Sequence, residues 1–262
     1  EHRAPDACRQ IPGLGCEALE DTLLNDLTAA DAKSFGHKLW RNAQRPNSKS
    51  TIDDRELYWQ RLSIKRNTKR AEPLDANQQS KLVAFERASR GFDDLEFRAG
   101  ASLNILITGF DPFGLHNNLH QTNPSGVVAL SFDGLVISHQ GITAELQSAI
   151  FPVRFEDFDE GMVESVVSPL LIENSKLDAI ITVSMGRDGF DLERFPARRR
   201  SAQAPDNLML KTGASRTNPL IPSLGDSPLT GPEFVEFTLP TKGMLSEQTP
   251  YPVRDNRNVA TL

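Results

Sequence analysis

The run from Ile105 to Gly114 (Ile-Leu-Ile-Thr-Gly-Phe-Asp-Pro-Phe-Gly) constrains this chain more than any other feature. Its first part is an apolar segment typical of a buried strand, and the rest is a turn that contains two phenylalanines and two glycines. Asn123-Pro124-Ser125 follows, and Asn before Pro is typical of the start of a helix. A strand, an aromatic turn and a capped helix predict an α/β enzyme with a small ligand pocket at the carboxyl end of a strand.

The segments after residue 102 alternate between strand and helix patterns. We expect an α/β fold whose mixed, largely parallel sheet has helices on both faces, as in phosphorylase- and hydrolase-like proteins. The residues rich in Pro and Gly over 208–232 predict a surface loop or lid. The expected strands cover 103–108, 135–138, 143–153, 178–185 and 250–256, and the expected helices cover 125–132, 155–174 and 233–245, the last broken at Pro240.

Residues 1–102 have a different pattern, with helical spacing of apolar residues and no chemical motif. We expect helices over 21–42, from a capping box of Thr51 and Asp54 to about 69, and from Asp75 to about Gly91. The chain is therefore predicted to consist of a helical accessory extension, residues 1–102, packed on an α/β domain, residues 103–262.

The composition excludes several classes of protein. With 38% hydrophobic and 24% charged residues, the 262-residue chain is expected to be soluble and globular. Its net charge of −6 argues against nucleic acid as a partner, and no apolar run is long enough to predict a membrane span.

The two cysteines, Cys8 and Cys16, lie in a short segment with one Pro and two Gly. They could form a disulfide, which is typical of an oxidising compartment, or remain reduced in a mobile tail. The chain starts at Glu1 rather than Met, and a processed N-terminus with a disulfide would favour an extracytoplasmic location over the cytoplasm.

The motifs T-G-F-x-P-F-G and N-P-S resemble those of pyroglutamyl peptidase I (pyrrolidone-carboxylate peptidase), a family of cysteine omega-peptidases. The resemblance implies that Phe110 and Phe113 line a pocket for the pyroglutamyl ring, with Asn123 near the pocket mouth, although a buried core turn and a simple helix cap are the alternatives. It also implies a peptide with N-terminal pyroglutamate as the substrate, a homo-oligomer, and no cofactor. His116 and His120 are four residues apart but lack further ligands, so we expect no metal site.

A second similarity lies in the stretch from Gly186 to Arg194 and in Pro205-Asp206-Asn207. The resemblance assigns Glu193 as the catalytic-site glutamate and Asp206 as a second, supporting carboxylate. A placed carboxylate can orient a histidine or accept a hydrogen bond from the substrate N–H. The alternative is an ordinary exposed pair of Glu193 and Arg194.

The chain also departs from the family pattern. Arg198 replaces an asparagine and Gln203 replaces an arginine; no Cys follows Cys16, and no His follows His139. Because the family uses a Cys nucleophile and a His base downstream of Pro-Asp-Asn, we expect the domain to be incomplete at its C-terminal end, and activity of these residues alone stays open. One hypothesis is a pyroglutamyl peptidase whose nucleophile lies beyond Leu262. The other is an inactive binding protein for pyroglutamyl or otherwise capped peptide ends, and a nucleoside-phosphorylase-like enzyme is a weaker third, since no phosphate-binding loop is present.

Overall fold

The computed structural model of the protein divides into two compact units. Unit 1 comprises Glu1–Val153 and Asn174–Ser184, and unit 2 comprises Arg154–Glu173 and Met185–Leu262. In the described residues, no helix is both long and apolar enough to cross a membrane. The structure describes residues 2–19, 22–46, 51–71, 73–98, 100–171, 177–186, 189–200, 204–215, 217–224 and 226–259.

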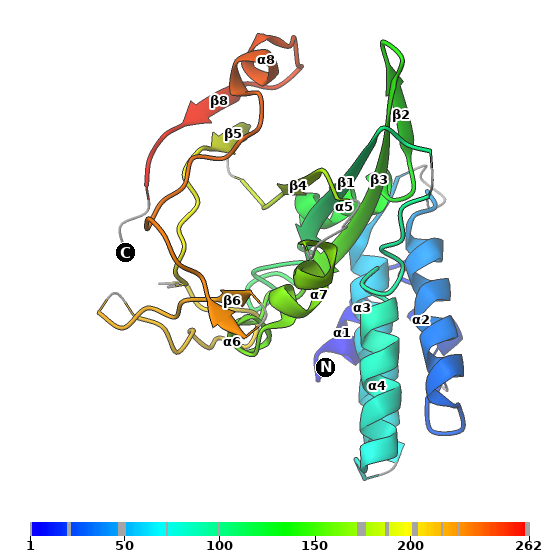
Figure 1. Ribbon diagram of the computed structural model, residues 1–262. Helices are drawn as coiled ribbons and strands as arrows, with labels where there is room; N and C mark the ends of the chain where they lie inside the picture. The colour runs from blue at the N-terminus through cyan, green and yellow to red at the C-terminus, as the bar shows by residue number, and fades with distance from the viewer. Residues whose placement is uncertain are drawn as a thin grey trace. The chain divides into compact units, whose positions relative to one another are not determined.

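Unit 1 begins with helices, of which α2 and α4 pack against each other and α3 packs against α2 (Figure 1). Thr28 and Asp75 cap α2 and α4 by accepting hydrogen bonds from backbone N–H groups in the first turn. The helices are α1 (Ala4–Gln10), the 3₁₀ helix η1 (Cys16–Leu19), α2 (Ala29–Ala43), α3 (Asp54–Ala71) and α4 (Ala76–Ala88).

Two predicted helix starts were wrong. The helix expected from residue 21 begins at Ala29, because the capping box of Thr28 with Asp31 satisfies the first N–H groups there. The helix expected from Thr51 begins at Asp54, because the Asp53 carboxylate accepts from the Arg55 backbone N–H at 3.0 Å. The expected capping box thus lies two residues too early.

After these helices, unit 1 contains a four-stranded sheet in the order β2-β3-β1-β4. β1 (Leu103–Phe110) runs parallel to β3 (Ile142–Phe151) and to β4 (Ala179–Thr182), whereas β2 (Val136–His139) is antiparallel to β3 and lies at an edge. The predicted α/β fold with a mixed, largely parallel sheet is confirmed. Because β1 and β3 are in register from Leu103–Ala144 to Phe110–Phe151, their carboxyl ends meet at one edge.

One hydrophobic core joins the N-terminal helices to this sheet. Helix α5 (Pro124–Phe132) contacts β1 and β3, and its Ala129 and Leu130 belong to the same buried cluster as Ile150 of β3. From the helices, this cluster includes Leu39, Trp40, Leu57, Ile64, Leu82 and Phe85, and Leu24 joins it from the segment before α2.

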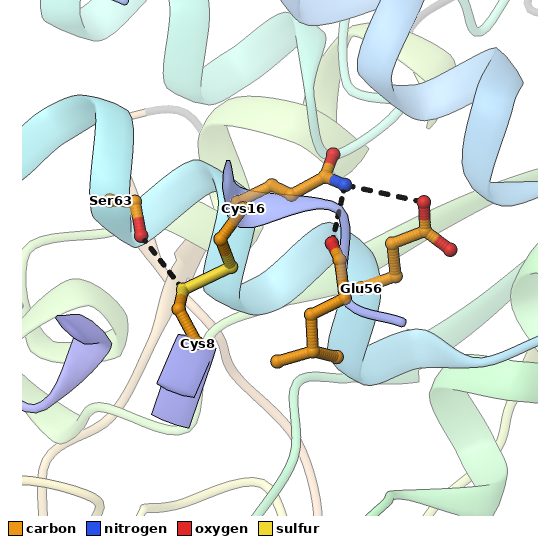
Figure 2. The surroundings of a disulfide bond; sticks show 6 residues. Cys8, Cys16, Glu56 and Ser63 are labelled. Atoms are coloured by element: carbon orange, nitrogen blue, oxygen red, sulfur yellow. Dashed lines mark hydrogen bonds between the residues drawn. A yellow bond between two sulfur atoms is a disulfide. The ribbon is translucent and has the colours of Figure 1, made fainter. Parts of the chain in front are cut away.

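The disulfide between Cys8 and Cys16 is formed, which decides between the two alternatives left open by the sequence. It closes the N-terminal segment against α3, where Ser63 lies 3.4 Å from the Cys8 Sγ (Figure 2). Gln60 of α3 donates to the Leu14 carbonyl at 2.7 Å. The segment packs into a second apolar cluster with Tyr58, Trp59 and Leu115.

Unit 2 contains short elements joined by long loops. The helix expected over 155–174 is divided into α6 and α7, because Gly161 adopts a positive φ of 82° between them; the expected end of this helix lies outside the described residues. The expected loop 208–232 contains a two-residue hairpin, β6 and β7, and the only helical part of 233–245 begins after Pro240. The elements are α6 (Phe155–Asp159), α7 (Met162–Leu171), β5 (Phe190–Glu193), β6 (Ser223–Leu224), β7 (Ser227–Pro228), α8 (Thr241–Ser246) and β8 (Val253–Asn256).

Candidate functional site

The aromatic turn lies at the carboxyl end of β1, at the edge where β1 and β3 end together. The Asp111 N–H donates to the Phe151 carbonyl at 2.9 Å and so extends the pairing of the two strands by one bond. Carboxyl ends of neighbouring parallel strands are the usual location of ligand sites in α/β sheets. The sequence-based placement of the turn is therefore confirmed in position.

Helix α5 holds the turn by close backbone approach. A Cβ on Gly109 would lie 2.2 Å from the Ser125 carbonyl oxygen, and one on Gly126 would lie 2.7 Å from the Phe110 carbonyl oxygen. The Phe110 N–H donates to the Ser125 hydroxyl at 3.1 Å. These contacts require glycine at both positions and leave the turn little freedom relative to α5.

Phe110 and Phe113 are both half-buried. Pro112, between Asp111 and Phe113, is fully buried and anchors the turn. Aromatic rings with an accessible face at a strand end can bind a flat, uncharged ring by covering its faces. Their assignment as ring-binding residues stays a prediction.

Asn123 is buried, and its side chain serves the fold. Its Nδ2 donates to the Asp111 carbonyl at 2.9 Å, and its Oδ1 accepts from the Ser125 N–H at 3.1 Å and from the Ser125 hydroxyl at 2.7 Å. The helix-cap alternative is therefore present in the structure. A substrate contact by Asn123 stays a prediction.

Asp54, at the start of α3, accepts from the Asn123 N–H at 2.8 Å. Burial raises the pKa of the Asp54 carboxyl to about 7; the Asn123 N–H opposes this shift, whereas the negative charges of Asp53 and Asp111 add to it. The Oδ1 atom of Asp54 has no hydrogen-bond partner in the described structure. The sequence pattern predicted Asp54 only as a capping residue at the start of a helix and not as part of a site.

A buried cluster of charged residues lies behind the turn and was also missed by the sequence motifs. Asp111 accepts from Arg61 at 2.6 Å and forms an ion pair with Arg90 at 2.9 Å. Glu86 pairs with Arg90 at 2.7 Å and with Lys65 at 2.5 Å. The only signal in the sequence was the aspartate inside the aromatic turn, since the spacing of the basic residues resembles an ordinary exposed helix face.

The pKa shifts of Glu86 and Arg90 favour the charged form of both groups. Burial alone would raise the pKa of Glu86, but Lys65, Arg90 and Arg61 together lower it well below its ordinary value. Burial opposes the charge on Arg90, yet Asp111 and Glu86 raise its pKa. The cluster is thus a network of compensated charges, in which each group depends on its neighbours.

The two predicted catalytic carboxylates belong to unit 2 and differ in environment. Asp206 is buried, and its carboxylate accepts three backbone N–H groups, from Leu208 at 2.8 Å, from Leu210 at 3.0 Å and from Phe155 at 3.0 Å. It therefore shapes its own loop and caps the first turn of α6. This structural role is what its carboxylate does in the described unit, and a catalytic role stays a prediction.

Glu193 is the last residue of β5 and is exposed. Both of its carboxylate oxygens accept from the Asn256 Nδ2, at 3.0 and 2.9 Å, across the parallel pair β5–β8. The neighbouring Arg194 pairs with Asp255 and Glu236 rather than with Glu193. An exposed carboxylate held by a neutral amide remains accessible to a further partner.

Each arginine of the run 198–200 has a partner: Arg198 donates to the Leu229 carbonyl, Arg199 pairs with Glu233, and Arg200 pairs with Glu164. Gln203, the predicted departure from the family, lies outside the described residues. Among the residues that the structure describes, no three His, Cys, Asp or Glu side chains are grouped to hold a metal ion.

The predicted site residues thus form two groups. Phe110, Phe113 and Asn123 lie together at one edge of the sheet of unit 1, whereas Glu193 and Asp206 lie in unit 2.

Residues 104–243, more than half of the chain, match the family model described as the C-terminal domain of PA0049. The chain belongs to the PA0049 C-terminal domain family. It is 30% identical over 244 residues to the uncharacterized protein PA0049 of Pseudomonas aeruginosa, an alignment that covers 77% of this chain and 44% of that protein.

The chain is also similar to pyrrolidone-carboxylate peptidase of Pyrococcus furiosus, with 28% identity over 147 residues, 55% of this chain and 59% of that protein. The predicted resemblance to the pyroglutamyl peptidase family is confirmed by this match. The chain spans about half the length of the curated relatives it matches, 44% of one and 59% of the other.

Solved structures similar to the chain include two peptidases. Pyroglutamyl peptidase I of Bacillus amyloliquefaciens has a TM-score of 0.43 at 23% identity, covering 61% of this chain and 68% of that one. A mutant of the Pyrococcus furiosus pyrrolidone carboxyl peptidase has a TM-score of 0.42 at 24% identity, covering 59% of this chain and 66% of that one. At these scores the superpositions carry no assignment of function.

Proposed function

We propose that this chain is part of a hydrolase that removes pyroglutamate from the N-terminus of peptides, and that it supplies the pocket for the pyroglutamyl ring. The observation that carries the proposal is the turn Gly109–Gly114, which holds two half-buried phenylalanines at the carboxyl edge of the sheet. The sequence similarity to a pyrrolidone-carboxylate peptidase, which extends over 147 residues, supports it.

The turn is chemically suited to a lactam ring. The lactam ring of a pyroglutamyl residue is flat and uncharged, so the faces of Phe110 and Phe113 can cover it without any ionic partner. Its lactam N–H and C=O also need hydrogen bonds, because an unpaired polar group in a pocket is costly. Backbone groups of the turn are the nearest candidates to supply them.

The hydrolytic step in this proposal uses a cysteine nucleophile and a histidine base. The thiolate would attack the carbonyl of the pyroglutamyl–peptide bond, and the C–N bond would break as the histidine transfers its proton to the leaving amine. Water would then hydrolyse the pyroglutamyl thioester, which releases pyroglutamate and restores the thiol. Glu193, exposed and held only by the Asn256 amide among the contacts described, would orient the histidine or accept the substrate N–H. Asp206 would keep the surrounding loop in place.

The second candidate is a protein that binds capped peptide ends without cleaving them. It is favoured by the disulfide, because the 262 residues contain two cysteines and the disulfide joins them, so neither has a free thiol. Under the first proposal, the nucleophile must therefore come from residues other than these 262.

Two assays separate the candidates. Binding of 2-pyrrolidone and of L-pyroglutamyl-glycine to the chain by calorimetry tests the pocket: Phe110→Ala and Phe113→Ala should abolish binding, whereas Phe132→Ala, on the exposed end of α5, should not. Absence of binding by the wild type would overturn both candidates. If the full-length natural protein hydrolyses a fluorogenic pyroglutamyl amide and iodoacetamide abolishes this activity, the peptidase is supported. Binding without hydrolysis supports the second candidate.

We also propose that the protein works in an oxidising compartment. The support is the disulfide, because such bonds persist mainly outside the reducing cytosol. Thiol labelling of the protein taken directly from its source under denaturing conditions tests this. Free thiols at Cys8 and Cys16 would contradict it.

A further inference from the structure

Buried ion pairs connect the N-terminal helices to the aromatic turn. We propose that Arg61 of α3 and Arg90, just after α4, are positioning residues for the ring-binding turn and act through Asp111. The assignment of the turn to ring binding rests on the proposed function, but the effect on the turn itself does not.

Asp111 is the centre of this arrangement. Its Oδ1 accepts from the Arg61 Nη2 at 2.6 Å, and its Oδ2 lies 2.9 Å from the Arg90 Nη2. The Arg61 side chain is fully buried, and those of Arg90 and Asp111 are 4% exposed. One carboxylate thus holds two guanidinium groups, one with each oxygen, which restrains both the place and the orientation of the aspartate.

The two arginines are themselves fixed by other parts of unit 1. Arg61 donates to the Ser89 carbonyl at 3.3 Å, which joins α3 to the end of α4. Arg90 donates to the Ile150 carbonyl at 3.1 Å and accepts from the Ile150 N–H at 3.0 Å, which joins it to β3. Asp111 is therefore held from two elements, each of which is packed in the main core.

Glu86 and Lys65 complete the charge balance. Glu86 lies 2.7 Å from Arg90 and 2.5 Å from Lys65, so three cations face two carboxylates. Without Glu86, the two arginines and the lysine would share a single carboxylate in a buried space. Such buried networks fix the orientation of their side chains but add little net stability compared with an apolar core. The function of this network is therefore better inferred from its place beside the turn than from its contribution to stability.

The location favours positioning because Asp111 follows Phe110 directly and precedes Phe113 by two residues. A displacement of Asp111 would move the backbone that carries both rings. The N-terminal part also holds the far side of the turn: Arg3 donates to the Leu115 carbonyl at 3.1 Å, and Asp54 accepts from the Asn123 N–H. The N-terminal part thus contacts the turn between the two phenylalanines, at Asp111, and the chain after them, at Leu115 and Asn123.

Asp111→Asn tests the proposal, because it keeps the size of the side chain and removes the charge that pairs with both arginines. The matched control is Asp93→Asn, since Asp93 also lies between two cations in the same unit, Arg87 at 3.0 Å and Lys33 at 3.5 Å, and these partners lie outside the turn. The readouts are the ring signals of Phe110 and Phe113 in protein with labelled phenylalanine, assigned with Phe→Leu variants, and the Kd for 2-pyrrolidone.

We expect folded Asp111→Asn to shift both ring signals and to bind 2-pyrrolidone about tenfold more weakly, since small displacements in a binding site reduce function by such factors. Asp93→Asn should leave both readouts at wild-type values even where it lowers the Tm. Ring signals of Asp111→Asn that coincide with those of the wild type would overturn the proposal.

If Asp111→Asn does not fold, Arg61→Lys and Arg90→Lys carry the same test, because each keeps the charge and loses the planar guanidinium. Unchanged ring signals in both lysine variants would overturn the proposal. If the wild type does not bind 2-pyrrolidone, the proposed function fails, and the ring signals still decide whether the arginines position the turn.

Discussion

The carboxyl group of Asp54 should make the stability of unit 1 depend on pH. Its pKa is about 7 in the folded protein, against 3.8 for an unperturbed aspartate. Between these values the unfolded chain loses a proton that the folded chain keeps, so the folded state binds more protons and its stability falls as pH rises. The difference between the two pKa values corresponds to on the order of 4 kcal/mol of unfolding free energy. The wild type loses this stability progressively as the pH rises from 3.8 to about 7.

Asp54→Asn isolates this contribution. The amide oxygen of asparagine can still accept the Asn123 N–H that Asp54 accepts at 2.8 Å, but the side chain cannot ionise. Relative to the wild type, the variant should therefore gain unfolding free energy from pH 4 to pH 7.5, by up to about 4 kcal/mol, and then stay level. Urea titrations followed by the fluorescence of the buried Trp40 and Trp59 measure the difference at each pH.

The control is Asp53→Asn, which removes the adjacent carboxylate and leaves Asp54 in place. It should keep most of the pH slope, because burial rather than Asp53 is the main cause of the raised pKa. Stability curves for the wild type and Asp54→Asn that run parallel from pH 4 to pH 7.5 would refute the reasoning.

Three other perturbations have defined outcomes. Gly109→Ala places a Cβ 2.2 Å from the Ser125 carbonyl and should cost more than about 3 kcal/mol or prevent folding, whereas Gly213→Ala, with open space around its Cβ, should leave the urea midpoint unchanged. Asp206→Ala frees three backbone N–H groups and should raise hydrogen exchange at residues 206–210 and cost about 2–4 kcal/mol; protected amides there would contradict this. The double variant Cys8→Ser, Cys16→Ser should unfold with about 2.5 kcal/mol less free energy, and equal urea midpoints with and without the disulfide would exclude a stabilising role.

The sequence was sufficient to predict β1 and the start of α5. The apolar run before Gly109 predicts β1, and Asn-Pro-Ser predicts the start of α5, because both depend on neighbours in the chain. Helix boundaries were less predictable. Asp53 rather than Thr51 caps α3, which begins at Asp54, and Gly161 divides the helix expected after Phe155. Such choices depend on which N–H groups are satisfied in the folded chain.

The candidate site was predictable only as far as its motif. The phenylalanines and Asn123 are in the turn and at the helix start, as expected, but the buried carboxylates and arginines around them come from residues scattered over 54–111. In the sequence, Arg61, Lys65 and Arg90 are indistinguishable from the exposed basic residues that flank them. Burial, which a local pattern does not contain, is what makes them different.

By itself, the sequence determined the strand, the aromatic turn and the capped helix, since these follow from side-chain type and from steric limits between near neighbours. Only the tertiary structure decided what surrounds that turn. The raised pKa of Asp54 and the pairing of Asp111 with two arginines both require groups far apart in the chain to share one desolvated space. The free energy of a buried charge depends on all its neighbours together, so no short stretch of sequence could specify it.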